Sequence, residues 1–337
     1  VQGDNLNIPD FYNMSNASNV LSRNSVGRYR TYAFYGSLDL GIANQLYLTV
    51  TARNEWSSTM PQDNNSFFYP SVAASWVFTE PLGLSNSKAF PYGKLRASWA
   101  QVGNDAPIYV LGTYFSQVTA ADGWTSGIAY PLPDRDGNQT TSYGYSATLG
   151  NPNLKPEKVT SWEVGADLRF VNNKIGLDVT YYESKSEDQI VPAPIAGSTG
   201  FQQQYLNSGS IKNSGFEVAL NLTPVKTKDW KWDIGVNWST NKSEVLSLAE
   251  GVDILFLGGF EGSAIYAVQG QPYGTIYGGR WLRDASGAIV IGQDGYPIPD
   301  AQIGVIGDVN PDWISGINTT VSWKGLSLYA LFDIRQG

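Results

Sequence analysis

The amino-acid sequence predicts an all-β protein, an antiparallel transmembrane β-barrel of which this chain holds about ten strands. Apolar residues alternate with polar or small ones in about ten segments, as in strands with one apolar and one wet face. Short and long connections alternate between these segments, as in a barrel with short periplasmic turns and long extracellular loops. The 20 Tyr, 13 Phe and 11 Trp suit aromatic girdles at the membrane interfaces.

The segment at 230–241 shows the alternation most clearly. Large apolar side chains occupy its even positions up to Trp238, including Trp230 and Trp232, and polar or small residues lie between them. The same pattern predicts the other strands in order. The expected strands lie at 32–40, 46–55, 68–78, 94–101, 160–170, 175–183, about 216–222, 230–241, 313–323 and 326–335.

The connections support this order of strands. Tight turns are expected at 41–44, 171–174, 226–229 and 324–325, and a longer connection with Pro81 and Pro91 joins the third and fourth strands. The long extracellular loops are expected at about 56–66, 102–158, 186–210 and 242–312. Pro70 predicts a bulge or the beginning of its strand, and the run Asn213-Ser214-Gly215 predicts a bulge or a close backbone approach.

An open sheet of ten strands would leave unpaired backbone groups at two edges, which is costly in lipid. We therefore interpret residues 1–337 as part of a single barrel domain, without a plug and without the strands that close the barrel. Phe34, Leu48, Trp76, Trp162, Leu177, Leu220, Ile234 and Leu328 are expected to face lipid.

Composition excludes several classes of function. No window approaches about eighteen consecutive apolar residues, so no helical membrane span is predicted. The chain has no Cys and no His, which excludes a disulfide framework, a thiol nucleophile, a Ser-His-Asp triad and His-ligated zinc. A net charge of −8 argues against nucleic acid as a partner. No cofactor or metal is predicted, and Asp308 and Asp312 are interpreted as turn caps.

Several phrases, which occur along the chain in the family's order, resemble the SusC/RagA-type family of TonB-dependent outer-membrane transporters of Bacteroidota. The most specific is Gly150-Asn151-Pro152-Asn153-Leu154-Lys155-Pro156-Glu157, followed by Ser161-Trp162-Glu163-Val164-Gly165. The others are Tyr69-Pro70-Ser71-Val72, Leu95-Arg96-Ala97-Ser98-Trp99-Ala100-Gln101-Val102-Gly103-Asn104, Asn213-Ser214-Gly215-Phe216-Glu217, Gly307-Asp308-Val309-Asn310-Pro311-Asp312-Trp313 and Phe332-Asp333-Ile334-Arg335. From the residues alone, the two prolines of the first phrase predict a rigid, extended lead-in to a strand rather than a ligand site.

The resemblance covers about residues 30–337 and implies a barrel of about 22 strands around an N-terminal plug, located in the bacterial outer membrane. It implies active import of an oligomeric nutrient, a glycan or an oligopeptide. It also implies coupling to the TonB complex through absent N-terminal parts, and a SusD-type surface lipoprotein as partner. No enzyme activity is expected.

Two groups of residues are candidates for function. The first consists of charges on the polar side of the strands, which pair with one another and a plug, line a solute path or form a paired-carboxylate site: Arg53, Arg96, Glu163, Asp167, Arg169, Glu217 and Asp233. The second consists of loop aromatics suited to stacking on sugars or contacting a partner protein, although they also fit a cap over the barrel mouth: Trp124, Tyr143, Tyr145, Tyr266, Tyr273, Tyr277 and Trp281.

Two other classes of function remain compatible with the residues. A passive porin or adhesin barrel would have the same wall but no plug. A secreted, aromatic-rich, glycan-binding β-protein would show the same alternation, since soluble sandwiches and propellers can also produce it.

Overall fold

A computed structural model describes residues 2–21, 26–117, 119–120, 128–129, 132–133, 135–136, 139–140, 143–249, 251–260 and 262–337. The chain divides into two compact units, Val1–Arg30 and Thr31–Gly337. In the smaller unit, strands β1 (Gln2–Leu6) and β2 (Ala17–Leu21) form an antiparallel pair beside a short 3₁₀ helix, η1 (Met14–Asn16). The buried Asn16 amide donates to the carbonyls of Ile8 and Phe11 at 2.8 and 2.7 Å and stabilises the intervening turn.

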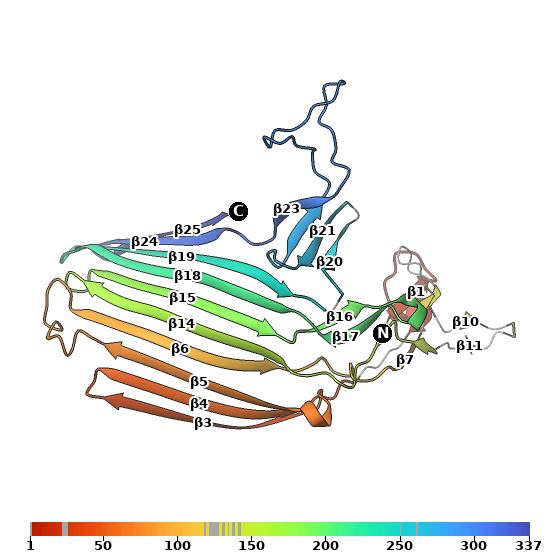
Figure 1. Ribbon diagram of the computed structural model, residues 1–337, viewed down its shortest axis with the longest axis horizontal. Coiled ribbons are helices and arrows are strands. Elements are labelled where there is room, and N and C mark those ends of the chain that lie inside the picture. Colours follow the sequence, from red (N-terminus) through yellow and green to blue (C-terminus); the bar gives the residue numbers. More distant parts are fainter. Residues whose placement is uncertain are drawn as a thin grey trace. The chain divides into compact units, whose positions relative to one another are not determined.

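The larger unit contains a ten-stranded antiparallel sheet whose strands follow one another in chain order (Figure 1). This confirms the predicted fold class. Among the described residues the two edge strands are not paired with each other. The ten strands are β3 (Thr31–Ile42), β4 (Leu46–Ser57), β5 (Ser66–Val77), β6 (Tyr92–Asn104), β14 (Glu157–Phe170), β15 (Ile175–Glu187), β18 (Ser210–Lys226), β19 (Trp230–Ser247), β24 (Trp313–Trp323) and β25 (Leu326–Gln336).

Several strands extend further than the sequence predicts. β18 begins at Ser210 and β19 ends at Ser247, so parts expected as loop are strand. The alternation breaks there, because Lys212 and Glu244 replace apolar residues on the outer face and the buried Ile211 and Val245 lie on the other face, but the pairing of the two strands continues. The predicted loop boundaries at 102, 158, 186, 210 and 242 are therefore wrong by a few residues, because each falls inside a strand.

The long connections contain short elements of their own. A three-stranded sheet joins β13 (Thr148–Leu149), β16 (Ile190–Pro194) and β17 (Gln203–Asn207), and a four-stranded sheet joins β20 (Ile254–Phe260), β21 (Ser263–Val268), β22 (Thr275–Gly278) and β23 (Gly304–Asp308). The remaining elements are η2 (Gln62–Asn64), η3 (Gly197–Thr199), β7 (Phe115–Gln117), β8 (Thr119–Ala120), β9 (Ile128–Ala129), β10 (Leu132–Pro133), β11 (Gln139–Thr140) and β12 (Tyr143–Tyr145). In the described part of the chain, no helix is long and apolar enough to cross a membrane.

The pairing register separates the wall of the sheet into an apolar face and a polar face. One cross-strand row of the apolar face joins Leu168, Leu177, Leu220, Val236, Ile317 and Phe332 on six consecutive strands. The adjacent row of the polar face joins Lys94, Asp167, Asp178, Ala219, Asn237, Gly316 and Asp333. Leu220 and Glu217 thus point to opposite faces, as the alternation predicts.

Aromatic side chains bound the apolar face at both ends. Toward the long connections, the rings of Trp162 and Tyr181 lie 5.3 Å apart, and Tyr181 lies 4.9 Å from Phe216. Toward the short turns, Trp230 stacks on Trp323 at 5.7 Å. Two aromatic rows separated by aliphatic side chains are typical of a wall that crosses a membrane.

The predicted tight turn at 171–174 is present, with positive φ angles of 51°, 54° and 63° at Val171, Asn172 and Asn173. Asparagine tolerates this left-handed conformation better than most residues. The Lys324-Gly325 turn likewise has φ angles of 43° and 88°.

The expectation for Pro70 needs correction, and of the two alternatives for the run at 213–215 only the close backbone approach is confirmed. Pro70 lies inside β5 in regular register with Ala52, and pairing with β6 begins only at Ser71. The register of β18 is also regular at Gly215, so neither site is a bulge. Gly215 instead permits a close approach, because a Cβ atom there would lie 2.0 Å from the Thr240 carbonyl oxygen.

Candidate functional site

The polar face carries all seven predicted wall charges, and most of them form ion pairs within it. Arg53 pairs with Glu55 at 2.7 Å, and Asp167 lies between Lys94 at 3.9 Å and Arg169 at 3.8 Å. The further pairs are Arg96–Asp178 at 2.6 Å and Lys231–Asp233 at 2.6 Å. Glu163 and Glu217 have no cationic partner within 4.0 Å among the described residues.

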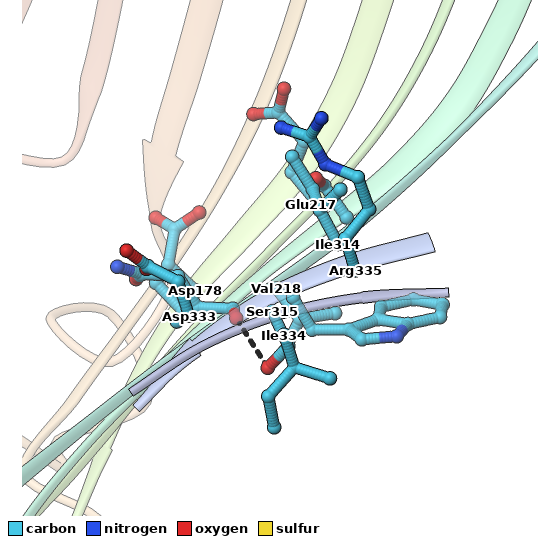
Figure 2. Close-up of a pocket in the computed structure, with 13 residues that line it drawn as sticks. Asp178, Glu217, Val218, Ile314, Ser315, Asp333, Ile334 and Arg335 are labelled. Carbon is cyan, nitrogen blue, oxygen red and sulfur yellow. Dashed lines mark hydrogen bonds between the residues drawn. The ribbon is translucent and has the colours of Figure 1, made fainter. Parts of the chain in front are cut away.

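A concavity of about 800 Å³ lies on the polar face between β15 and β25. Asp178, Glu217, Asp333 and Arg335 project into it from the same side of the sheet (Figure 2). Asp178 is already held by both terminal nitrogens of Arg96, at 2.7 and 2.6 Å. The arrangement offers a hydrated, charged surface for contact with polar groups. Within the described ranges, no cluster of three or more acidic residues could hold a metal ion.

Four of the predicted loop aromatics form two separate groups. Tyr266 and Tyr277 meet edge to face on neighbouring strands of the four-stranded sheet, with ring centroids 5.7 Å apart, and Phe256 meets Tyr266 at the same distance. Tyr143 and Tyr145 lie on β12, where Tyr145 packs on Phe115 at 4.3 Å. Trp124 lies outside the described residues.

Phe256 and Phe260 were missed by the sequence reasoning, although they line a cavity of about 250 Å³ with Tyr266 and Tyr277. The side chain of Phe260 is 88% exposed. Tyrosine and tryptophan are the expected loop candidates, because their polar tips suit a partly solvated surface. The signal that identifies the two phenylalanines is their position in a glycine-rich hairpin between predicted strands, where the alternation does not require an apolar residue.

The connection between β22 and β23 forms a narrow ribbon. The backbone of Trp281 pairs with that of Pro299, and the Arg280 guanidinium donates to the Asp300 carboxylate at 2.8 Å. Hydrogen bonds from the Gln302 amide and from Arg280 lower the pKa of Asp300. Trp281 remains 48% exposed and Tyr273, before β22, 42% exposed, so both rings are available for contact.

This ribbon also contains a side-chain-stabilised turn. Asp284 accepts hydrogen bonds from the hydroxyl and the amide of Ser286 and from the amide of Ala288, and these bonds lower the pKa of its carboxyl. Asp308 accepts from the Asn310 amide at 2.8 Å, which agrees with its interpretation as a turn cap.

The four-stranded sheet is attached to the end of β19. The Val245 amide donates to the Gln271 carbonyl at 2.9 Å, and the Gly270 amide donates to the Val245 carbonyl at 2.8 Å. The Tyr273 amide donates to the Ser243 hydroxyl at 3.3 Å. The wall strand thereby positions the loop that presents Tyr273, Tyr277 and Trp281.

The proline-rich run at 150–157 holds three long connections together. The Leu154 side chain is fully buried in a cluster with Met60, Phe67, Ala106 and Val110. Around it, the Asn64 amide group donates to the Leu154 carbonyl at 3.3 Å, and the Asn207 side chain bonds both backbone groups of Lys155. These contacts explain the run as a scaffold for the loops.

Comparison with known proteins identifies the family. The family model described as TonB dependent receptor-like, beta-barrel matches residues 2–330. The chain belongs to this family. TonB-dependent receptors of this kind are transporters rather than enzymes, and the barrel places the chain in the bacterial outer membrane.

Among similar receptors are TonB-dependent receptor P26 of Formosa agariphila, 28% identical over 97% of this chain and 34% of that receptor, and TonB-dependent receptor SusC of Bacteroides thetaiotaomicron, 31% identical over 66% of this chain and 21% of SusC. A solved structure of the RagAB peptide importer in the closed-closed state matches 97% of this chain and 36% of that chain, with a TM-score of 0.77 and 22% identity. The chain thus spans about a third or less of the length of these relatives.

Proposed function

We propose that the complete receptor imports an oligomeric nutrient across the outer membrane, with energy supplied through TonB. In this proposal the ten strands form part of a closed wall of about 22 strands around a plug. The observation that carries the proposal is the division of the sheet into a lipid-compatible apolar face and an ion-paired polar face, within a chain of the TonB-dependent receptor family.

The polar face supplies a surface that suits both a plug and a hydrated solute. Glu163 and Glu217 keep no close cationic partner among the described residues, and Glu217 borders the concavity with Arg335. Such charges can pair with groups of a plug or of a solute on the interior of the barrel. We assign the seven wall charges to this interior.

In the proposed transporter the long connections face the cell exterior, because the short turns of such barrels lie on the periplasmic side. The similarity to the RagAB peptide importer supports an oligopeptide as substrate. The resemblance to the SusC/RagA-type family supports a glycan as the alternative substrate and a SusD-type surface lipoprotein as partner. The exposed rings of Tyr143, Tyr145, Tyr266, Tyr273, Tyr277 and Trp281 supply flat surfaces for either contact.

Uptake by cells tests the proposed function. Deletion of the gene is expected to abolish growth on one class of oligomer, a glycan or a peptide mixture, while growth on the corresponding monomers continues. Restoring the complete receptor should restore growth only in cells with a working TonB complex. Uptake that persists without TonB would contradict active import and indicate a passive pore.

Photo-crosslinking tests the proposed partner. A crosslinking amino acid at Tyr273 or Trp281 of the complete receptor is expected to capture a surface lipoprotein, because both rings are exposed on the long-connection side. The same group at Trp230, at the short-turn end of β19, should capture lipid instead. Capture of only lipid or periplasmic proteins from Tyr273 and Trp281 would contradict the orientation.

A further inference from the structure

A group of charged side chains lies on the apolar side of the wall, beyond the aromatic row at Trp162, Tyr181 and Phe216. These charges lie on the neighbouring strands β14, β15 and β18 (Figure 1). Each is an even number of residues from the aromatic residue of its own strand, in regular register, and so points to the same face. We call this group the lysine belt: Lys158, Lys185 and Lys212, with Glu183 and Glu187.

Lys242 and Glu244 of the neighbouring strand β19 lie on the same face, with Glu244 directly opposite Lys212, so that four lysines meet three glutamates there. Lys158 and Lys185 share the Glu187 carboxylate, at 3.8 and 2.8 Å, and Lys212 contacts Glu183 at 2.9 Å. Lys185 and Lys212 lie directly opposite each other in the ladder, and two like charges in such positions destabilise the strand pair. The carboxylates of Glu183, Glu187 and Glu244 offset part of this repulsion, and a bound anion between the two strands would offset the rest.

The lysine side chains remain accessible, at 48%, 44% and 36% exposed for Lys158, Lys185 and Lys212. Each lies four residues beyond its aromatic neighbour, or about 13 Å along the strand. With strands tilted by about 40°, this is about 10 Å further along the barrel axis. Because the aromatic row marks the edge of the hydrocarbon layer, the ammonium groups lie at the depth of lipid head groups.

We propose that the lysine belt binds the phosphate groups of the lipopolysaccharide in the extracellular leaflet. Phosphate complements the excess of ammonium groups, and lysines near a membrane surface attract anionic head groups. The flanking rings of Trp162, Tyr181 and Phe216 would contact the acyl chains just below. This inference rests on the orientation in the proposed function, in which the long connections face the cell exterior.

The test uses the complete receptor, purified in mild detergent from outer membranes, and measures bound lipid by mass spectrometry. The variant K158Q/K185Q/K212Q is expected to retain at most about one tenth of the bound lipopolysaccharide. Each lysine near the surface contributes about a fivefold increase in affinity for an anionic lipid. The matched control K226Q/K228Q/K324Q removes three lysines at the short-turn end and should leave lipopolysaccharide unchanged. Heat-modifiable migration on gels and TonB-dependent uptake should be unaltered in both variants.

A second variant separates direct phosphate binding from other roles of the lysine belt. E183Q/E187Q removes the competing carboxylates, so bound lipopolysaccharide should stay the same or rise. A loss equal to that of the lysine variant would assign binding to a divalent cation held by the carboxylates and overturn the proposal.

Three other results would also overturn it. Unchanged lipopolysaccharide in the lysine variant would leave the transport function intact but remove the lipid site. A change in oligomeric state with lipid unchanged would show that a second copy of the receptor covers the lysine belt. A selective loss of phospholipid would show that the lysine belt lies at the periplasmic leaflet, which contradicts the orientation as well.

Discussion

Replacing Leu220 with arginine is expected to lower the free energy of unfolding of the complete receptor by about 2–4 kcal/mol. Leu220 lies in the middle of the aliphatic band, between Leu177 and Val236 in the ladder and four residues from the aromatic row at Phe216. A guanidinium at this depth must leave water for hydrocarbon, and no acidic side chain lies beside Leu220 in its cross-strand row. The measurement is denaturant unfolding of the purified receptor, with outer-membrane abundance as a second readout.

Ala219→Arg is the matched control for this substitution. Ala219 is the neighbouring residue of β18 but points to the polar face, between Asp178 and Asn237. The same side chain placed there enters a hydrated, acidic surface and should cost less than about 1 kcal/mol, within the usual range for surface substitutions. Equal losses for Leu220→Arg and Ala219→Arg would contradict the assignment of the two faces.

The strand order and the two faces of the wall could be predicted because lipid on one side and water on the other impose a period of two on every strand. Leu220 and Glu217 differ by an odd number of positions, so their opposite orientation follows from sequence alone. The outer parts of β18 and β19 break the alternation, because charged residues such as Lys212 and Glu244 replace apolar ones on the outer face, while Ile211 and Val245 lie buried on the other face. Only the backbone ladder shows that these residues belong to strands.

The candidate site was predicted less completely than the wall. The parity of Asp167 and Asp233 predicts their place on the polar face, but it does not identify their partners Lys94 and Lys231. The pairing of Arg96 with Asp178 joins β6 to β15 across β14, and such a contact depends on register and side-chain length. The edge-to-face packing of Tyr266 and Tyr277 depends on a hairpin inside a predicted loop. The sequence of this loop has no regular alternation, so the hairpin could not be predicted from it.

The same limit applies to the run at 150–157. Its prolines predict an extended backbone, but the fully buried Leu154 became evident only in the folded protein, because its neighbours come from three different connections. Hydrogen bonds from Asn64 and to Asn207 hold the backbone on either side of this side chain. The cluster therefore determines how the long loops are arranged above the wall strands.

Leu154→Ala is accordingly expected to destabilise the loop scaffold by about 2–5 kcal/mol, the range for removing a buried leucine side chain. The wall should remain folded, because its strands are held by their own ladder. Hydrogen exchange of the complete receptor should show faster exchange at Asn64, Leu154 and Asn207, with protection of β15 and β18 unchanged. Binding of the surface lipoprotein should weaken as the loops lose their fixed positions.

Leu82→Ala provides the control, because Leu82 is 62% exposed in the connection after β5 and the same atoms are removed without leaving a cavity. Its expected effect is below about 0.5 kcal/mol. If the Leu154→Ala receptor showed the same hydrogen-exchange rates as the Leu82→Ala receptor, the run at 150–157 would not act as a scaffold. Its role would then have to lie in direct contact with a ligand. A graded result, in which Leu154→Val loses less protection than Leu154→Ala, would support packing as the cause, because the loss then follows the volume removed.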